Sequence, residues 1–101
     1  MKVLWSHTAL GHLTNIFEYI RRDSPRYAQR MVDRITARSK QIAHAPELAP
    51  VVAEYGDPAV REVLEGPYRV IYRVESDAVI VLAVIHGARI LPPKLPDDND
   101  A

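Results

Sequence analysis

Residues 68–89 read YRVIYRVESDAVIVLAVIHGAR, and this stretch decides the fold. Two β-rich runs flank the polar pair Ser76 and Asp77, which is the pattern of a β-hairpin. Alternation in the first run places apolar and aromatic residues on one face and a half-polar set on the other. The face predicted to join the core consists of Tyr68, Val70, Tyr72 and Val74.

The second run, residues 78–85, is apolar on both faces. A strand of this kind is stable only when both of its sides are covered. In so short a chain we expect a second molecule to cover one of the two sides of this strand. The face assigned to this partner consists of Val79, Val81, Ala83 and Ile85.

The composition of the whole chain is that of one small globular domain. The chain has 101 residues, 48% of them hydrophobic and 26% charged, with no cysteine. The N-terminal apolar run is too short for a signal peptide, and no run reaches the ~18 residues of a membrane span. We therefore expect a cytoplasmic protein with no disulfide and no membrane association.

Two amphipathic helices are predicted before the hairpin. Apolar residues at helical spacing from Leu10 to Ile20 indicate the first helix, which Ser6 or Thr8 can cap. Ser24 followed by Pro25 starts the second helix, which we expect to continue to about Ala45. The inner face predicted for this helix comprises Ala28, Met31, Ile35 and Ile42.

The second helix also carries a row of arginines that recur every four residues. The row consists of Arg26, Arg30, Arg34 and Arg38. The chain as a whole has 13 basic and 13 acidic residues, but its first 45 residues carry eight basic and three acidic side chains. The row is either a solvated helix face or a surface that meets an acidic partner.

The remaining segments complete the element order. Residues 46–58 contain three acidic residues and three prolines and are expected to form a loop, whereas residues 60–65 alternate like a strand. With a strand at residues 2–5, the order is strand, helix, helix and three strands. We predict an α+β fold in which a helical hairpin packs on one face of a mainly antiparallel four-stranded sheet, with the opposite face open. The domain is expected to span residues 1–91, followed by a flexible Pro- and Asp-rich tail at 92–101.

The chain resembles the ParE branch of the RelE/ParE toxin superfamily. The resemblance covers residues 2–89 and depends on the order and spacing of several short elements. These elements are Trp5-Ser6, Ala9, Leu13, Ile16, Tyr19-Ile20, Ser24-Pro25, Ala28, Pro46, Val60-Arg61-Glu62, Tyr68 to Tyr72 and His86 to Arg89. His12 departs from the pattern, because members usually carry an acidic residue there.

The resemblance implies the toxin of a type II toxin–antitoxin system, bound and held inactive by a ParD- or RelB-like antitoxin. It also implies two targets, since ParE-like members are associated with poisoning DNA gyrase and RelE-like members cut messenger RNA on the ribosome. The antitoxin is expected to cover the face of residues 78–85 described above and to be steered by Arg26, Arg30 and Arg34.

RNA cleavage without a metal needs an acid, a base and cations that stabilise the transition state. The groups available for such chemistry are His86, Arg61, Arg69 and Tyr72. His86 is more simply explained as a strand-end histidine bonded to nearby backbone, whereas Arg61 and Arg69 could equally form cross-strand ion pairs with Glu65 or Glu75. The histidines lack metal-ligand spacing and the glycines form no phosphate loop, so neither a metal nor a nucleotide cofactor is expected.

The acidic 46–58 loop and the scarcity of lysine favour a gyrase inhibitor that acts by binding rather than as an enzyme. An mRNA endoribonuclease and an inactive interaction module remain as alternatives. The residues assigned to target contact are Arg61, Arg69, Arg73, His86 and Arg89.

Overall fold

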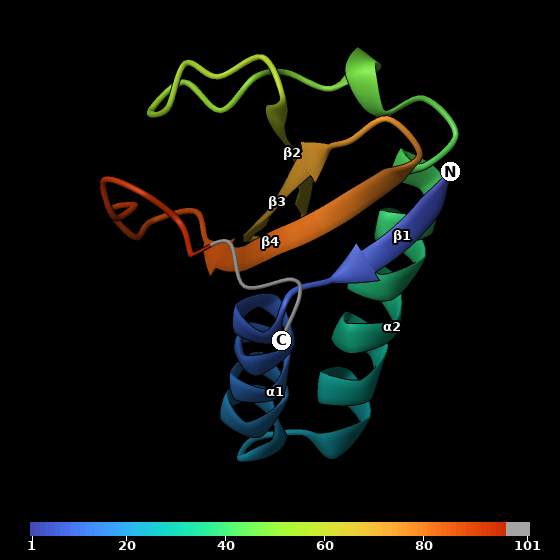
Figure 1. Ribbon diagram of the computed structural model, residues 1–101. Coiled ribbons are helices and arrows are strands. Elements are labelled where there is room, and N and C mark those ends of the chain that lie inside the picture. Colours follow the sequence, from blue (N-terminus) through green and yellow to red (C-terminus); the bar gives the residue numbers. More distant parts are fainter. Residues whose placement is uncertain (97–101) are drawn as a thin grey trace.

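The computed structural model describes residues 1–96 and contains the predicted order of elements (Figure 1). The elements are β1 (Lys2–Trp5), α1 (His7–Arg21), α2 (Pro25–Ile42), the 3₁₀ helix η1 (Pro46–Leu48), β2 (Val60–Glu65), β3 (Tyr68–Val74) and β4 (Ala78–His86). The four strands form one sheet in the order β1-β4-β3-β2. β1 runs parallel to β4, and the other two pairings are antiparallel. The predicted mainly antiparallel four-stranded sheet is therefore confirmed.

Both helices begin at the serines that the sequence indicates. The Ser6 hydroxyl accepts a hydrogen bond from the Ala9 amide, and the Ser24 hydroxyl accepts one from the Tyr27 amide. α2 ends at Ile42, before the expected end at Ala45, because residues 43–45 already form turns ahead of Pro46. The predicted inner face of α2 is buried as expected, and Ser39 is buried with it.

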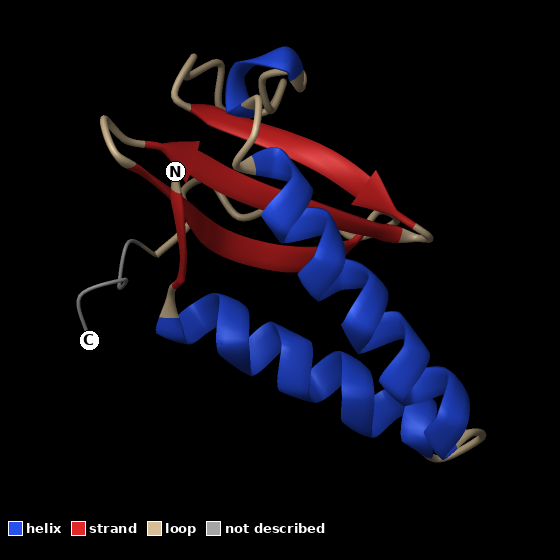
Figure 2. Ribbon diagram, turned by 90° about the vertical axis from the view of Figure 1, so that its right-hand side faces the viewer, coloured by secondary structure: helices blue, strands red, loops and turns tan. Residues whose placement is uncertain are grey.

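The helical hairpin covers one face of the sheet and forms the first of two cores (Figure 2). This core contains Ile16 of α1, Met31 and Ile35 of α2 and the predicted face of β3. The helix α1 contributes less than its periodicity suggests, since Leu10 is exposed and Leu13, Phe17 and Ile20 are only partly buried. Of this predicted face, only Ile16 is buried.

A β-bulge in β4 changes which of its side chains share a face. Ile71 lies opposite Ala83 whereas Tyr72 lies opposite Val81, so Leu82 is an extra residue without a partner on β3. Val79 and Val81 consequently join the core beneath the helices, whereas Ala83 belongs to the core on the other face. The prediction that Val79, Val81, Ala83 and Ile85 form a single face is wrong, because the bulge shifts the alternation by one residue.

The face of the sheet away from the helices is also covered by the chain itself. Its second core combines side chains of β3 and β4 with Val52, from the loop before β2, and with Leu91 and Leu95, from the segment after β4. The expectation of an open face is therefore wrong. Flexibility of the tail stays a prediction, with residues 97–101 outside the described residues, but Leu91 and Leu95 are both buried.

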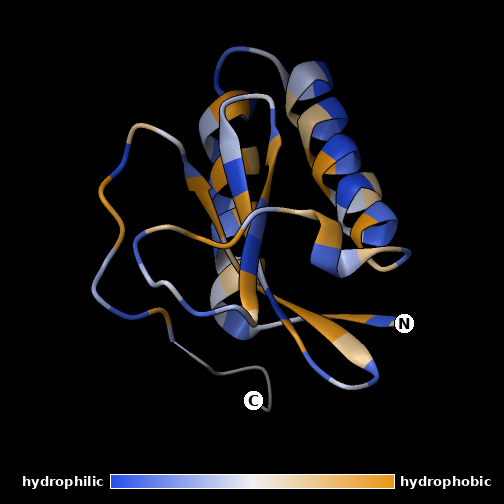
Figure 3. Cartoon of the chain, turned by 90° about the horizontal axis from the view of Figure 1, so that it is seen from above, coloured by the Kyte–Doolittle hydropathy of each residue, from blue (hydrophilic) through white to orange (hydrophobic). Residues whose placement is uncertain are grey.

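This packing removes the argument for a partner on β4. Val79, Val81 and Ala83 have no exposed surface, because α1 and α2 cover one side of the strand and the two loop segments cover the other. Only Ile85, at the end of the run, remains partly exposed. Figure 3 shows how the hydrophobic residues gather along the strands inside the molecule.

Candidate functional site

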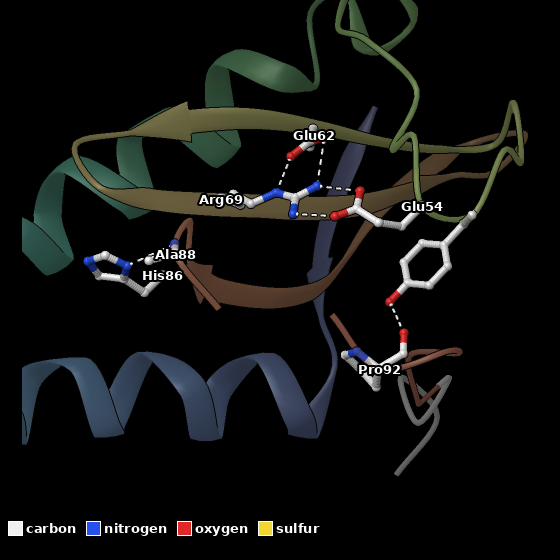
Figure 4. Close-up of polar contacts among 7 residues, drawn as sticks. Glu54, Glu62, Arg69, His86, Ala88 and Pro92 are labelled. Carbon is white, nitrogen blue, oxygen red and sulfur yellow. Dashed lines mark hydrogen bonds and ion pairs between the residues drawn. The ribbon is translucent and has the colours of Figure 1, made fainter. Parts of the chain in front are cut away.

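Arg69 is held between two carboxylates on the face of the sheet away from the helices (Figure 4). Its Nε and Nη2 donate to Glu62 at 2.6 and 2.9 Å, and its Nη1 and Nη2 donate to Glu54 at 2.8 and 2.9 Å. These hydrogen bonds lower the pKa of Glu54 from 4.5 to about 2 and raise that of Arg69. The Arg69 side chain is only 13% exposed, and its guanidinium has no pair of donors left for another anion.

Arg61 lies on the opposite face of β2 and supports the loop that precedes the strand. It pairs with Tyr72 across the sheet, and its guanidinium donates to the backbone carbonyls of Pro58, Glu47 and Ala49 at 3.0, 3.1 and 2.8 Å. Neither Arg61 nor Arg69 pairs with Glu65 or Glu75 as predicted. Arg61 thus satisfies carbonyls in a loop that has little regular structure of its own.

The Tyr72 hydroxyl is also engaged inside the protein. It donates to the carbonyl of Pro46 at 2.7 Å, and the side chain is fully buried. Burial raises the pKa of Tyr72, and the nearby Arg61 and Arg38 cations only partly oppose this effect. A buried, neutral phenol that already donates its proton is poorly placed to relay one.

His86 is exposed at the end of β4. Its Nδ1 accepts a hydrogen bond from the Ala88 amide at 3.1 Å, which matches the interpretation of a strand-end histidine bonded to backbone. Its ring meets Tyr68 edge to face, with ring centroids 5.7 Å apart. The Nε2 side of the imidazole remains for contact with another molecule.

The five residues predicted to contact a target are not brought together. Arg61 lies on the helix side of the sheet and Arg69 on the other side, since they neighbour Tyr72 and Ile71, which belong to different cores. Arg73 is half-buried and Arg89 is exposed. Only His86 and Arg89, three residues apart at the end of β4, are both exposed and close in the chain.

The arginine row of α2 is divided among different contacts. Arg34 donates twice to Glu65 of β2, at 2.7 and 2.9 Å, and so ties the helix to the sheet. Arg38 is half-buried near Tyr72 and donates to Gln41 at 3.1 Å. Arg26 and Arg30 are exposed and form no ion pair within residues 1–96. Arg34 is exposed as well, so Arg26 and Arg30 differ from it in lacking an ion pair among the described residues.

Sequence reasoning missed the polar contacts that join α1 to the bulge of β4. The Val84 amide donates to Nδ1 of His12 at 3.2 Å, and the Ser6 hydroxyl donates to the Leu82 carbonyl at 3.3 Å. β1 ends at Trp5, opposite Val81, so β4 has no strand beside it on that side from Leu82 onward, and these two side chains bond its backbone there. The signal in the sequence was the unusual His12, whose role becomes clear only from the fold.

The part of the chain that the structure describes contains no group of three metal-ligating side chains and no helix long and apolar enough to cross a membrane.

Comparison with known families gives a match over residues 3–91 to the ParE toxin of the type II toxin–antitoxin system parDE. The chain belongs to the ParE toxin family. Membership makes it the toxin of a type II toxin–antitoxin system and implies an antitoxin partner.

One relative agrees with this assignment, and one solved structure shares the fold. The ParE-family chain is 33% identical over 90 residues to Toxin RelE2 of Caulobacter vibrioides, covering 88% of this chain and 98% of that one. Its fold matches a chain of the chromosomal ParDE toxin–antitoxin system from P. aeruginosa with a TM-score of 0.70, at 22% identity. That match covers 85% of this chain and 95% of the other. The resemblance to ParE toxins and the predicted fold are thereby confirmed.

Proposed function

We propose that this ParE-family toxin inhibits DNA gyrase by binding to it, without chemistry of its own, and that its cognate antitoxin neutralises it by direct contact. One observation carries the proposal: the side chains that RNA cleavage would use are already bonded inside the protein. Arg69 is held by two carboxylates, Arg61 by three carbonyls and the Tyr72 hydroxyl by the Pro46 carbonyl.

The charge around Arg69 also opposes an endoribonuclease. One guanidinium between two ionised carboxylates, Glu54 and Glu62, leaves this part of the sheet with a net negative charge at neutral pH. A phosphodiester would be repelled there rather than stabilised, and cleavage depends on cations placed where negative charge develops. His86 and the neighbouring exposed Arg89 supply one titratable group and one cation, which is an insufficient catalytic set because cleavage needs both an acid and a base.

We therefore narrow the proposed target contacts to His86 and Arg89 at the exposed end of β4. Arg61 and Arg69 keep a structural role, because their donors are occupied, and half-buried Arg73 is not included. For the antitoxin, Arg26 and Arg30 are the arginines of α2 that remain exposed and outside ion pairs among the described residues. Long-range attraction from these two would speed encounter with an acidic segment.

A supercoiling assay with purified gyrase tests the target. The toxin should block supercoiling or trap cleaved DNA, and an equimolar amount of the antitoxin should relieve the effect. Arg89→Ala should weaken inhibition. Arg26, on α2, is exposed too, and Arg26→Ala should leave inhibition intact and slow association with the antitoxin.

Three outcomes would contradict the proposal. The first is that folded toxin in large molar excess leaves gyrase unaffected, while induction without the antitoxin still arrests growth. New cuts in translated mRNA, mapped by primer extension and absent with His86→Ala, would support the endoribonuclease. Normal growth after induction without the antitoxin would support an inactive interaction module.

A further inference from the structure

Aromatic side chains gather where the helical hairpin lies beside the start of β3. Tyr19, near the end of α1, is 69% exposed, and Tyr27, in the first turn of α2, is 44% exposed. Tyr68, at the start of β3, packs into the core beneath the helices. Burial raises the pKa of Tyr68, and the nearby phenols of Tyr27 and Tyr19 raise it further. One phenol from each helix therefore lies close to the phenol of the strand.

His86 extends this group on the same side of the sheet. It lies directly opposite Tyr68 in the β3–β4 ladder, and the two rings meet edge to face with centroids 5.7 Å apart. Directly opposed residues of antiparallel strands point to the same face, so His86 shares the helix side with the tyrosines. We call these four residues the aromatic surface: Tyr19, Tyr27, Tyr68 and His86.

The hydroxyl groups of this surface are not used inside the protein. Tyr55 and Tyr72 each donate to a backbone carbonyl, whereas the hydroxyls of the three tyrosines in the aromatic surface form no hydrogen bond within residues 1–96. A tyrosine with an exposed ring and an unused hydroxyl offers another protein both apolar area and a hydrogen-bonding group. The exposed parts of Tyr19 and Tyr27 therefore remain available for binding.

Arginines surround the aromatic surface. Three exposed arginines follow its exposed members at a spacing of three residues, and they are Arg22 after Tyr19, Arg30 after Tyr27 and Arg89 after His86. Residues three apart on a helix are neighbours on its surface. None of these arginines forms an ion pair within residues 1–96. Glu18 is already bound by Arg21 at 2.6 Å, so Asp23 is the carboxylate of the inter-helix turn that remains to oppose them.

We propose that the aromatic surface and its arginines bind an acidic surface of the toxin's target protein. The identity of that target rests on the proposed function, in which gyrase is inhibited through His86 and Arg89. Tyr19 and Tyr27 are added as central contacts, and the target is thereby placed on the helix side of the sheet. Arg30 also belongs to the pair proposed to attract the antitoxin, and the test therefore leaves Arg30 unchanged.

The chemistry of this surface favours a protein over a nucleic acid. Tyrosine and arginine are the residues that most often dominate the energetics of protein interfaces. A surface that follows a phosphate backbone normally belongs to a strongly basic domain. This chain has a net charge of zero and an isoelectric point of about 6.9, so isolated arginines beside tyrosines fit scattered carboxylates better than a phosphate chain.

Titration of the complete toxin against gyrase in a supercoiling assay tests the two exposed tyrosines. The double variant Tyr19→Ser/Tyr27→Ser should raise the concentration for half-maximal inhibition by about tenfold or more. Leu48→Ser is the matched control, because Leu48 is 87% exposed and should change that concentration by no more than about twofold. Leu48 lies in η1, beyond the far end of α2 from Tyr27, and about 20 Å of helix separates the two positions. Melting temperatures report whether each variant is folded.

A charge reversal tests the acidic character of the target surface. Arg22→Glu should weaken inhibition by at least about fivefold more than Lys40→Glu, which makes the same charge change at an exposed position in the last turn of α2. The difference between the two variants should shrink as the ionic strength rises from about 0.05 M to about 0.3 M, because salt screens exposed charges. Equal effects of the two reversals at low salt would contradict an acidic partner at this surface.

The outcomes separate this surface from the identity of the target. If wild-type toxin blocks gyrase and the folded double variant blocks it equally well, the aromatic surface is overturned and the proposed target stands. If wild-type toxin leaves gyrase unaffected, the proposed target fails, and growth after induction without the antitoxin decides the surface. Arrest by the double variant as strong as by wild type, or no arrest by either, would then overturn the surface, whereas loss of arrest in the double variant alone would support it.

Binding to a DNA duplex without gyrase tests the alternative occupant. Fluorescence anisotropy should show no binding of the wild-type toxin at physiological ionic strength. Salt-dependent binding that the double variant loses would assign the aromatic surface to a nucleic acid and overturn the proposal.

Discussion

The segment after β4 provides the sharpest test of how the sheet is covered. Leu91 and Leu95 are 8% and 7% exposed and pack against the second core. Replacing a buried leucine by alanine costs about 2–5 kcal/mol, and a segment near the end of the chain can relax toward the lower value. The double variant Leu91→Ala/Leu95→Ala should therefore lose about 3–5 kcal/mol, a large part of the ~5–15 kcal/mol of a typical domain.

Urea unfolding followed by circular dichroism measures this loss. With a slope of about 1.5 kcal/mol per molar urea for a domain of this size, the midpoint of the double variant should fall by about 2–3 M. Ile90→Ala is the control, because its side chain is 96% exposed and its midpoint should barely move. Equal midpoints for the double variant and the control would refute the reasoning, since they would mean that the chain does not cover this face of its own sheet.

Two further predictions concern polar contacts that the sequence analysis did not predict. Glu54 has a pKa lowered to about 2 by the hydrogen bonds from Arg69, so its ionised form stabilises the fold above its ordinary pKa of 4.5 and this contribution is lost as the pH falls toward 2. Melting temperatures of wild type and Glu54→Gln should accordingly converge between pH 5 and pH 2, and a constant gap would contradict the assignment. His12→Ala removes the acceptor of the Val84 amide and should lower the free energy of unfolding by about 1–3 kcal/mol, whereas an unchanged urea midpoint would show that the bond contributes nothing.

The Arg69 cluster illustrates why a list of basic residues is a weak guide to a site. In the sequence, Arg69 stands in a strand beside aromatic residues, and nothing local distinguishes it from Arg73 or Arg89. Its two partners come from Glu62, seven residues earlier, and from Glu54 in a loop, 15 residues earlier. The acidic character of that loop was visible in the sequence, but the position of its carboxylate depends on the path of the loop across the sheet.

The predictions about β4 were partly right and partly wrong. Its apolar run correctly identifies a strand that is covered on both sides, because β-branched and aliphatic residues without polar neighbours require it. The prediction that a second molecule covers one side of this strand was wrong. Leu91 and Leu95 cover it instead, and they lie in a proline-rich segment whose local pattern predicts no regular structure. Leucines spaced in such a segment become informative only when a complementary apolar face lies within reach.

The sequence alone determined the order of strands and helices, the helix starts at Ser6 and Ser24 and the membership in the ParE toxin family. The element order and the helix starts depend on periodicity and capping, which act over a few residues, whereas the family membership follows from the similarity of residues 3–91 to ParE toxins. The tertiary structure alone decided that the bulge at Leu82 divides β4 between two cores and that the chain covers its own sheet. It also decided that Arg61 and Arg69 are occupied by partners within the chain. Those outcomes depend on contacts between residues far apart in sequence, which form only once the loops have fixed where each segment lies.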